Sequence, residues 1–122
     1  MKNTLKKNQV WLALRINDLF PPSMANDIYV LMDINSGYLF GNLLLNTVNI
    51  APKEENIEAL FRSARQMVKK WPDKLIMPEH SIAENAFLTI AEKNGISFGT
   101  SPLSDLSKIV APLKQTFSSI FG

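Results

Sequence analysis

The chain has 122 residues, a formal net charge of +2 and no cysteine. This length predicts one domain, residues 1–122, that can bury a core without cross-links. The lack of cysteine excludes disulfides, thiolate metal sites and a cysteine nucleophile, and it fits a reducing compartment. The apolar run from Val10 to Leu14 is too short for a bilayer span or a signal-peptide core. We therefore expect a cytoplasmic protein without a membrane partner, in which residues 1–8 form a flexible basic N-terminus.

The first half of the chain reads as three strands. Residues 9–16 are almost continuously apolar, which predicts a central strand covered on both faces. The Pro21-Pro22 pair then predicts a loop over residues 17–26. Residues 27–45 form two apolar arms joined by Asn35-Ser36-Gly37, which is typical of a β-hairpin.

The second half alternates helices with strands. A helix is predicted from Pro52 to Pro72, with this apolar face: Ile57, Leu60, Phe61, Ala64, Met67, Val68 and Trp71. A strand at 74–77 precedes a helix that a Ser81–Glu84 capping box opens, with Gly95 as its left-handed cap. A strand at 96–99 and a last helix from Ser101-Pro102 follow, and Pro112 should kink or split that helix at Val110.

The resulting order is β-β-β-α-β-α-β-α. A meander favours antiparallel pairing, whereas strands that alternate with helices favour parallel pairing with right-handed crossovers. The sequence therefore predicts an α/β fold with a mixed five-stranded sheet, in the order 3-2-1-4-5, flanked by helices.

Short signals along this layout match a known family. Trp11 opens the first strand, and Asp33 to Tyr38 reads as D-x-x-S-G-aromatic at the hairpin turn. Trp71-Pro72 leads the fourth strand, and Asn94-Gly95-Ile96 precedes the fifth. From Val10 to Ser119 the chain resembles the ribonuclease-H-like catalytic cores of retroviral-type integrases and transposases. It also resembles uncharacterised bacterial domains that carry the same layout without its catalysis.

The resemblance implies an activity for which residues are missing. Nucleases and transferases of this fold need acids in the first strand and at the end of the fourth, to hold two metal ions about 4 Å apart. The first strand here carries Arg15 and no acid, and Asp18 comes after it. At the fourth strand's end Glu79 has no partner acid, and one carboxylate holds Mg²⁺ poorly. We therefore expect no metal site and no cofactor.

Glu79 and His80 are the candidates for an enzyme site. His80 is the only histidine and follows Glu79 at a strand-to-helix turn, where open sheets place ligands. Together with Asp18 they could form a small site at the sheet's carboxyl edge. The alternative is an exposed histidine in a loop.

Two further groups of residues suggest binding. Arg62, Arg65, Lys69 and Lys70 could contact phosphate, although a solvated helix face explains them as well. The apolar residues Leu19, Phe20 and Met24, with Phe117 and Phe121, could form an interface or cap the core.

The sequence favours a non-catalytic binding or assembly module that acts through protein contacts, with an unknown protein or a second copy as its partner. Two alternatives remain open. One is a small enzyme that uses Glu79, His80 and Asp18. The other, less favoured, is a weak nucleic-acid binder.

Overall fold

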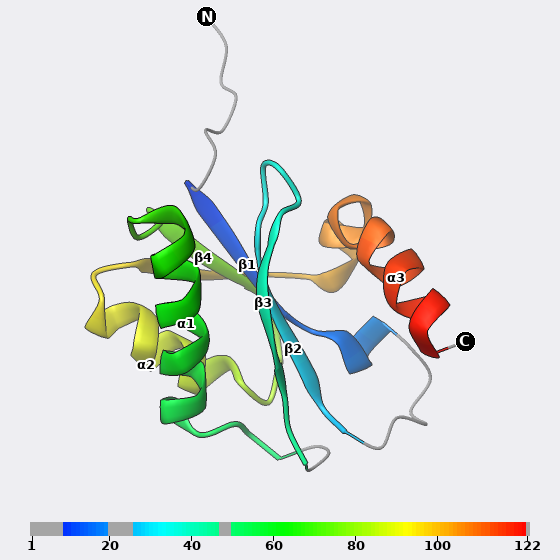
Figure 1. The fold of residues 1–122 in the computed structure, drawn as a ribbon, viewed down its shortest axis with the longest axis horizontal. Coiled ribbons are helices and arrows are strands. Elements are labelled where there is room, and N and C mark those ends of the chain that lie inside the picture. The colour runs from blue at the N-terminus through cyan, green and yellow to red at the C-terminus, as the bar shows by residue number, and fades with distance from the viewer. Residues whose placement is uncertain (1–8, 20–25, 47–49, 122) are drawn as a thin grey trace, which may run out of the picture.

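The computed structural model describes residues 9–19, 26–46 and 50–121, with the backbone only for Lys114 and residues 116–121. Its five strands are β1 (Val10–Arg15), β2 (Ile28–Asp33), β3 (Leu39–Leu44), β4 (Lys74–Pro78) and β5 (Ser97–Ser101). They form one sheet in the order β3-β2-β1-β4-β5 (Figure 1). β1 pairs antiparallel with β2 and parallel with β4, while β2–β3 is antiparallel and β4–β5 is parallel. The predicted mixed sheet with a central first strand is confirmed.

Helices cover both faces of this sheet. On one face lie α1 (Glu54–Val68) and α2 (Glu84–Lys93), and on the other lies α3 (Ser107–Phe121), preceded by the short 3₁₀ helix η2 (Leu103–Leu106) (Figure 1). Another 3₁₀ helix, η1 (Ile16–Leu19), follows β1. Side chains alternate along β1, so that Trp11 and Ala13 pack in the α1–α2 core while Leu12 and Leu14 pack in the α3 core. All four are fully buried, which explains the continuous apolar run of this strand.

The β2–β3 hairpin closes with the turn that the sequence predicts. The Asp33 carboxylate accepts hydrogen bonds from the Ser36 backbone N–H at 3.0 Å and from its hydroxyl at 2.6 Å. Gly37 follows with φ +77°, a conformation that favours glycine. The β2–β3 register skips one residue at Phe40, and that bulge turns Phe40 toward Trp11, with ring centroids 4.9 Å apart.

α1 ends earlier than the sequence suggested. Its last helical residue is Val68, and Lys69 adopts a left-handed conformation with φ 64° and donates its N–H to the Arg65 carbonyl. The prediction that Pro72 ends the helix is therefore wrong. Met67 was also wrongly placed on the inward face, because it is 53% exposed at the border of the stripe that Ile57, Leu60, Phe61 and Ala64 bury.

α2 begins at Glu84 and not at Ser81. The Ser81 hydroxyl accepts a hydrogen bond from the Ala83 N–H, two residues on, and the Ser81 carbonyl accepts one from the Glu84 N–H. Serine commonly forms such a local turn in competition with helix capping. The predicted capping box is therefore absent from the start of α2, whose N-cap is Ala83. Gly95 has φ +70° after the helix, as predicted.

α3 continues through Pro112, so the predicted split at Val110 is wrong. Proline removes one helical hydrogen bond, to the carbonyl of Lys108. Pro112 and Lys108 are both exposed, so water can satisfy that carbonyl. The departure from α-helical geometry is instead the 3₁₀ helix η2, which directly precedes α3. None of the helices in the described ranges is long and apolar enough to cross a membrane.

Candidate functional site

The carboxyl ends of β1 and β4 meet at one edge of the sheet. The two strands are parallel, and their register pairs Leu12 with Ile76. Arg15 ends β1, and Glu79 follows β4, where its N–H bonds to the Ser101 carbonyl of β5 at 2.9 Å. This edge is the place where an open sheet of this kind presents ligand-binding groups.

Arg15 dominates the β1 side of this edge. Its Nη2 lies 2.5 Å from Oδ1 of Asp27, and its Nη1 lies 2.9 Å from Oδ1 of Asp18. The side chain of Asp27 is fully buried, that of Arg15 is 13% exposed and that of Asp18 is 32% exposed. Burial alone lowers the pKa of Arg15, but the hydrogen bonds and charges of Asp27 and Asp18 outweigh it, so the pKa is raised. The guanidinium is permanently charged, and it engages both carboxylates on this side of the edge.

Two asparagines position Asp27 against Arg15. The Asn17 side chain donates to the Asn26 carbonyl at 2.8 Å and accepts from the Ile28 N–H at 2.9 Å. The Asn26 side chain donates to the Leu45 carbonyl at 2.9 Å. These bonds tie the residues on either side of Asp27 to η1 and to Leu45, the residue after β3, so the backbone around Asp27 is fixed directly before β2.

Tyr29 lies beside this ion pair. Its register partner on β1 is Arg15, so both side chains point to the α1–α2 face of the sheet. The Tyr29 hydroxyl is buried and has no hydrogen-bond partner in the described part of the chain. Burial, followed by the charge of Asp27, raises the pKa of Tyr29, so its hydroxyl stays protonated.

Glu79 and His80 stand apart from that cluster. His80 Nε2 lies 3.9 Å from Glu79 Oε1, and the two side chains are 90% and 43% exposed respectively. His80 also has φ 66°, in the left-handed region. No hydrogen bond or ion pair between described residues joins Asp18 to Glu79 or His80, and Asp18 instead binds Arg15.

The residues at this edge do not fit a divalent metal site. A two-metal centre needs several carboxylates free to coordinate. Here Asp18 and Asp27 are engaged by a cation, and Arg15 itself would repel a metal ion. Within residues 9–19, 26–46 and 50–121, no group of three or more acidic or histidine side chains could hold a metal.

The four basic residues proposed as phosphate contacts fall into two pairs with different surroundings. Arg62 and Arg65 line a small pocket together with Trp71, and the Arg65 guanidinium lies 5.7 Å from the Trp71 ring centroid. Lys69 and Lys70 are exposed beyond the end of α1. Trp11, Phe61 and Phe87 are buried core residues, and Trp71 is partly buried against them.

The apolar interface candidates lie mostly outside the described side chains. Leu19 is partly buried in η1 and packs on the α3 core. Phe20 and Met24 fall outside the described residues, and for Phe117 and Phe121 only the backbone of α3 is described.

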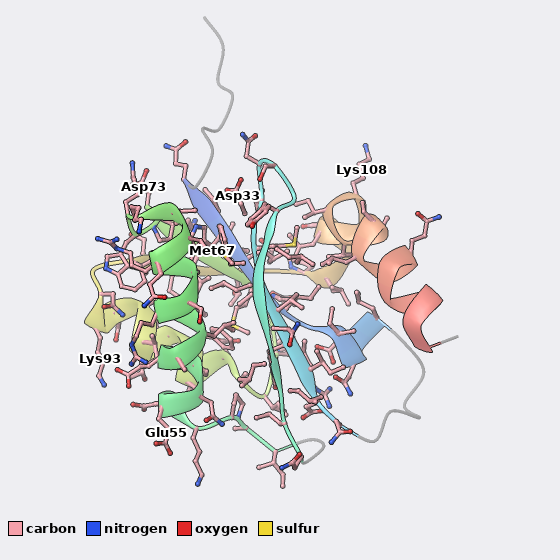
Figure 2. All side chains as sticks on the ribbon, in the orientation of Figure 1. Asp33, Glu55, Met67, Asp73, Lys93 and Lys108 are labelled. Carbon is pink, nitrogen blue, oxygen red and sulfur yellow. The ribbon has the colours of Figure 1, made fainter. Side chains whose placement is uncertain are left out.

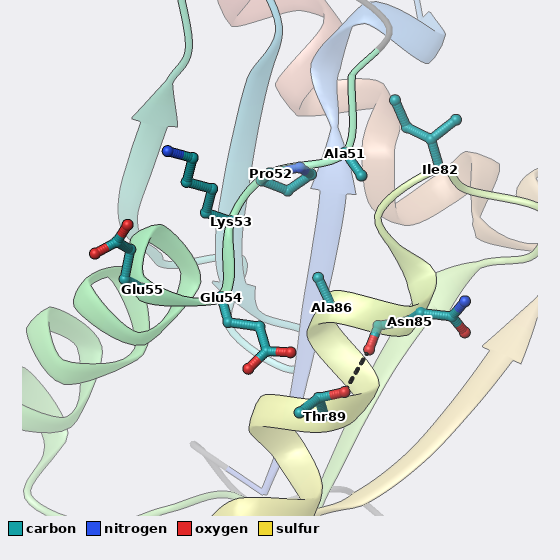
Figure 3. Close-up of a pocket in the computed structure, with 9 residues that line it drawn as sticks. All are labelled: Ala51, Pro52, Lys53, Glu54, Glu55, Ile82, Asn85, Ala86 and Thr89. Atoms are coloured by element: carbon teal, nitrogen blue, oxygen red, sulfur yellow. Dashed lines mark hydrogen bonds between the residues drawn. The ribbon is translucent and has the colours of Figure 1, made fainter.

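A pocket larger than the one beside Trp71 lies between the start of α1 and α2. Its volume is about 630 Å³, and Figure 3 shows its lining side chains coming from the first residues of α1 and the segment before them, and from α2 and the turn before it. The lining is mixed: Ala51, Pro52, Ile82, Ala86, Lys53, Glu54, Glu55, Asn85 and Thr89. The Thr89 hydroxyl donates to the Asn85 carbonyl at 2.9 Å.

Sequence reasoning missed the role of Asp27 and the larger pocket between α1 and α2. Asp27 is an acid directly before an apolar strand, and a buried acid of this kind needs a cationic partner. Arg15, at the end of another buried strand, was the matching signal. The pocket depends on how two helices pack, which no local pattern encodes.

No protein-family model and no curated protein matches this chain. Solved structures do. The HTLV-2 integrase catalytic core domain in complex with magnesium, in a dimeric form, has 13% sequence identity and a TM-score of 0.54, and the match covers 94% of this chain and 75% of that one. The catalytic core domain of BIV integrase has 12% identity and a TM-score of 0.49, over 92% of this chain and 70% of that one. The chain has the ribonuclease-H-like fold of an integrase core, at low sequence identity.

Proposed function

We propose that this chain is a non-catalytic assembly module built on a ribonuclease-H-like fold, with a second copy of itself as its partner. The observation that carries the first half of the proposal is the pairing of Arg15 with Asp27 and Asp18. At the edge where the resemblance implies metal-binding carboxylates, a cation engages both acids on the β1 side. The fold is kept and the means to hold a catalytic metal is not.

Exposed apolar side chains support assembly through protein contacts. Ile50 is 57% exposed and directly precedes Ala51, which lines the pocket between α1 and α2. Ile82, another residue of the pocket lining, is 45% exposed. With the exposed Ala51 and the half-buried Ala86 they form what we call the α1–α2 surface. Apolar side chains grouped around a hollow, with charged residues beside them, are typical of protein contact sites. The HTLV-2 core that shares this fold is in a dimeric form.

Light scattering over a wide concentration range tests this proposal. We expect the wild-type chain to exceed the 13.7 kDa of a single copy, and Ile82→Asp with Ile50→Asp to return it to that mass. Met67→Asp is the matched control, because Met67 is equally exposed but lies at the other end of α1 (Figure 2). A wild type that stays at the mass of one copy, or a loss of mass in the Met67 control as well, would contradict assembly through this surface.

The enzyme alternative receives less support. A site built from Glu79, His80 and Asp18 would need the three side chains to act together, and Asp18 is instead engaged by Arg15. Glu79 and His80 lie at the exposed turn after β4, with His80 Nε2 3.9 Å from Glu79 Oε1.

A further inference from the structure

A second, smaller pocket lies where the end of α1 meets the end of α2. Its volume is about 140 Å³, and it is lined by Glu58, Phe61, Arg62, Arg65, Trp71 and Asn94. Phe61 is buried and belongs to the core, whereas Arg62 is exposed at the pocket's mouth. The pocket is thus lined by two aromatic rings and two guanidinium groups.

The two arginines carry charge that the described part of the chain leaves uncompensated. No described carboxylate lies within 4 Å of either guanidinium. Glu58, the one acid among the six lining residues, lies 3.6 Å from Nζ of Lys93 on α2, and Glu54 lies 4.0 Å from the same nitrogen. Lys93 thus partly neutralises the carboxylate that would otherwise balance the arginines.

Arg65 lies against an aromatic cluster. Its guanidinium lies over the Trp71 ring, 5.7 Å from the centroid, and Trp71 itself packs against Trp11 and Phe61 with ring centroids 6.1 Å and 6.2 Å apart. A cation at this distance from an indole face is attracted by the negative face of the ring, which favours a position of the Arg65 guanidinium beside Trp71 in the pocket. Arg62 precedes Arg65 by three residues and so lies on the same side of α1.

We propose that this pocket binds a phosphate dianion, free or as the terminal group of a small molecule. Two neighbouring guanidiniums present paired N–H donors that match the oxygens of phosphate. The volume admits one such group and is well below the several hundred Å³ of a pocket for a whole nucleotide. Bound anion would also relieve the repulsion between two like charges three residues apart on one helix.

Trp71 supplies a direct readout for binding. The chain has two tryptophans, and Trp11 is fully buried, so a change in tryptophan fluorescence on adding an anion reports on Trp71. Inorganic phosphate is titrated against chloride at constant ionic strength. We expect a saturable change with a Kd of about 1 mM, equivalent to about 4 kcal/mol, together with a higher Tm.

Substitutions distinguish specific phosphate binding in this pocket from non-specific electrostatic attraction of the anion. Arg62→Gln should weaken phosphate binding roughly tenfold, the loss expected for one charge-assisted hydrogen bond. Arg65→Gln should do the same, and it is followed through the Tm because it alters the surroundings of Trp71. Lys53→Gln, an exposed cation at the other end of α1, should leave binding unchanged.

Three results would overturn the proposal. The first is a fluorescence or Tm response that chloride reproduces at the same ionic strength, and the second is an affinity that Arg62→Gln does not change. The third is a single-stranded oligonucleotide that binds more tightly per phosphate than the free ion with the same dependence on Arg62, since that would reassign the pocket to nucleic acid.

Discussion

Nη2 of Arg15 lies 2.5 Å from Oδ1 of Asp27, which joins the end of the central strand to a fully buried acid before β2. Both residues lie at the sheet's carboxyl edge, where the fold can hold ligands. The positive charge of Arg15 compensates a carboxylate whose burial would otherwise be costly.

Asp27→Asn should therefore destabilise the fold strongly. It leaves the Arg15 guanidinium without its buried partner, and breaking a buried ion pair from one side costs about 3 kcal/mol. Asp18→Asn is the matched control, because Asp18 binds the same guanidinium from a part-exposed position and should cost no more than about 1 kcal/mol. Urea unfolding measures both. Equal losses in the two variants would show that burial does not distinguish the two pairs.

Tyr29→Phe should leave stability at neutral pH unchanged or slightly higher. The variant removes a buried hydroxyl that has no hydrogen-bond partner among the described residues, so no bond is lost with it. Chemical unfolding at pH 7 compares the two proteins. A loss well above 1 kcal/mol would indicate a partner for the hydroxyl.

Tyr29 should also make the fold sensitive to alkali. Its pKa is raised in the folded state by burial and by the charge of Asp27, so the folded chain keeps a proton that the unfolded chain releases above about pH 10. Its contribution to stability is complete below that pH and falls as the pH rises toward the folded pKa. The decline should be shallower in Tyr29→Phe and unchanged in Tyr38→Phe, the exposed tyrosine. Parallel declines in all three proteins would refute this assignment.

Gly37→Ala should destabilise the hairpin by about 1 kcal/mol. An added Cβ would meet nothing within 4 Å, so the cost comes from the φ of +77° alone. Gly41→Ala is the control on the same hairpin: its Cβ would lie 3.5 Å from Leu60 Cδ1 in ordinary contact, and its φ is not in the left-handed region. Thermal unfolding should show a lower Tm for the first and no loss for the second. A loss at Gly41 of the same size would mean that helix contact, and not backbone conformation, limits this hairpin.

The sheet could be predicted from the sequence because its signals are local and agree with one another. The apolar run around Ala13, the Asn35-Ser36-Gly37 turn and the alternation of later elements each restrict the strand order. Helix ends were less predictable. Ser81 forms a turn with Ala83 in competition with capping Glu84, and Lys69 takes a left-handed conformation that glycine more often adopts.

The candidate site was only partly predictable, because it depends on contacts between distant residues. The lack of an acid in β1 and the presence of Arg15 were visible in the sequence. The engagement of Arg15 by Asp27, twelve residues away, arises from the antiparallel pairing of β1 with β2. The phosphate pocket likewise needs the end of α2 to meet the end of α1, so the sequence showed its arginines without their setting.

Titration with Mg²⁺ and Mn²⁺, followed by the Tm, tests the central claim most directly. If Arg15 has replaced the means to hold a catalytic metal, either ion should leave the Tm where a monovalent salt of equal ionic strength leaves it. A site filled to a hundred times its Kd would instead raise stability by about 2.7 kcal/mol, or several degrees. A saturable rise of that size, lost in Asp18→Asn or Glu79→Gln, would contradict the account and restore a metal-dependent enzyme as the best reading of this fold.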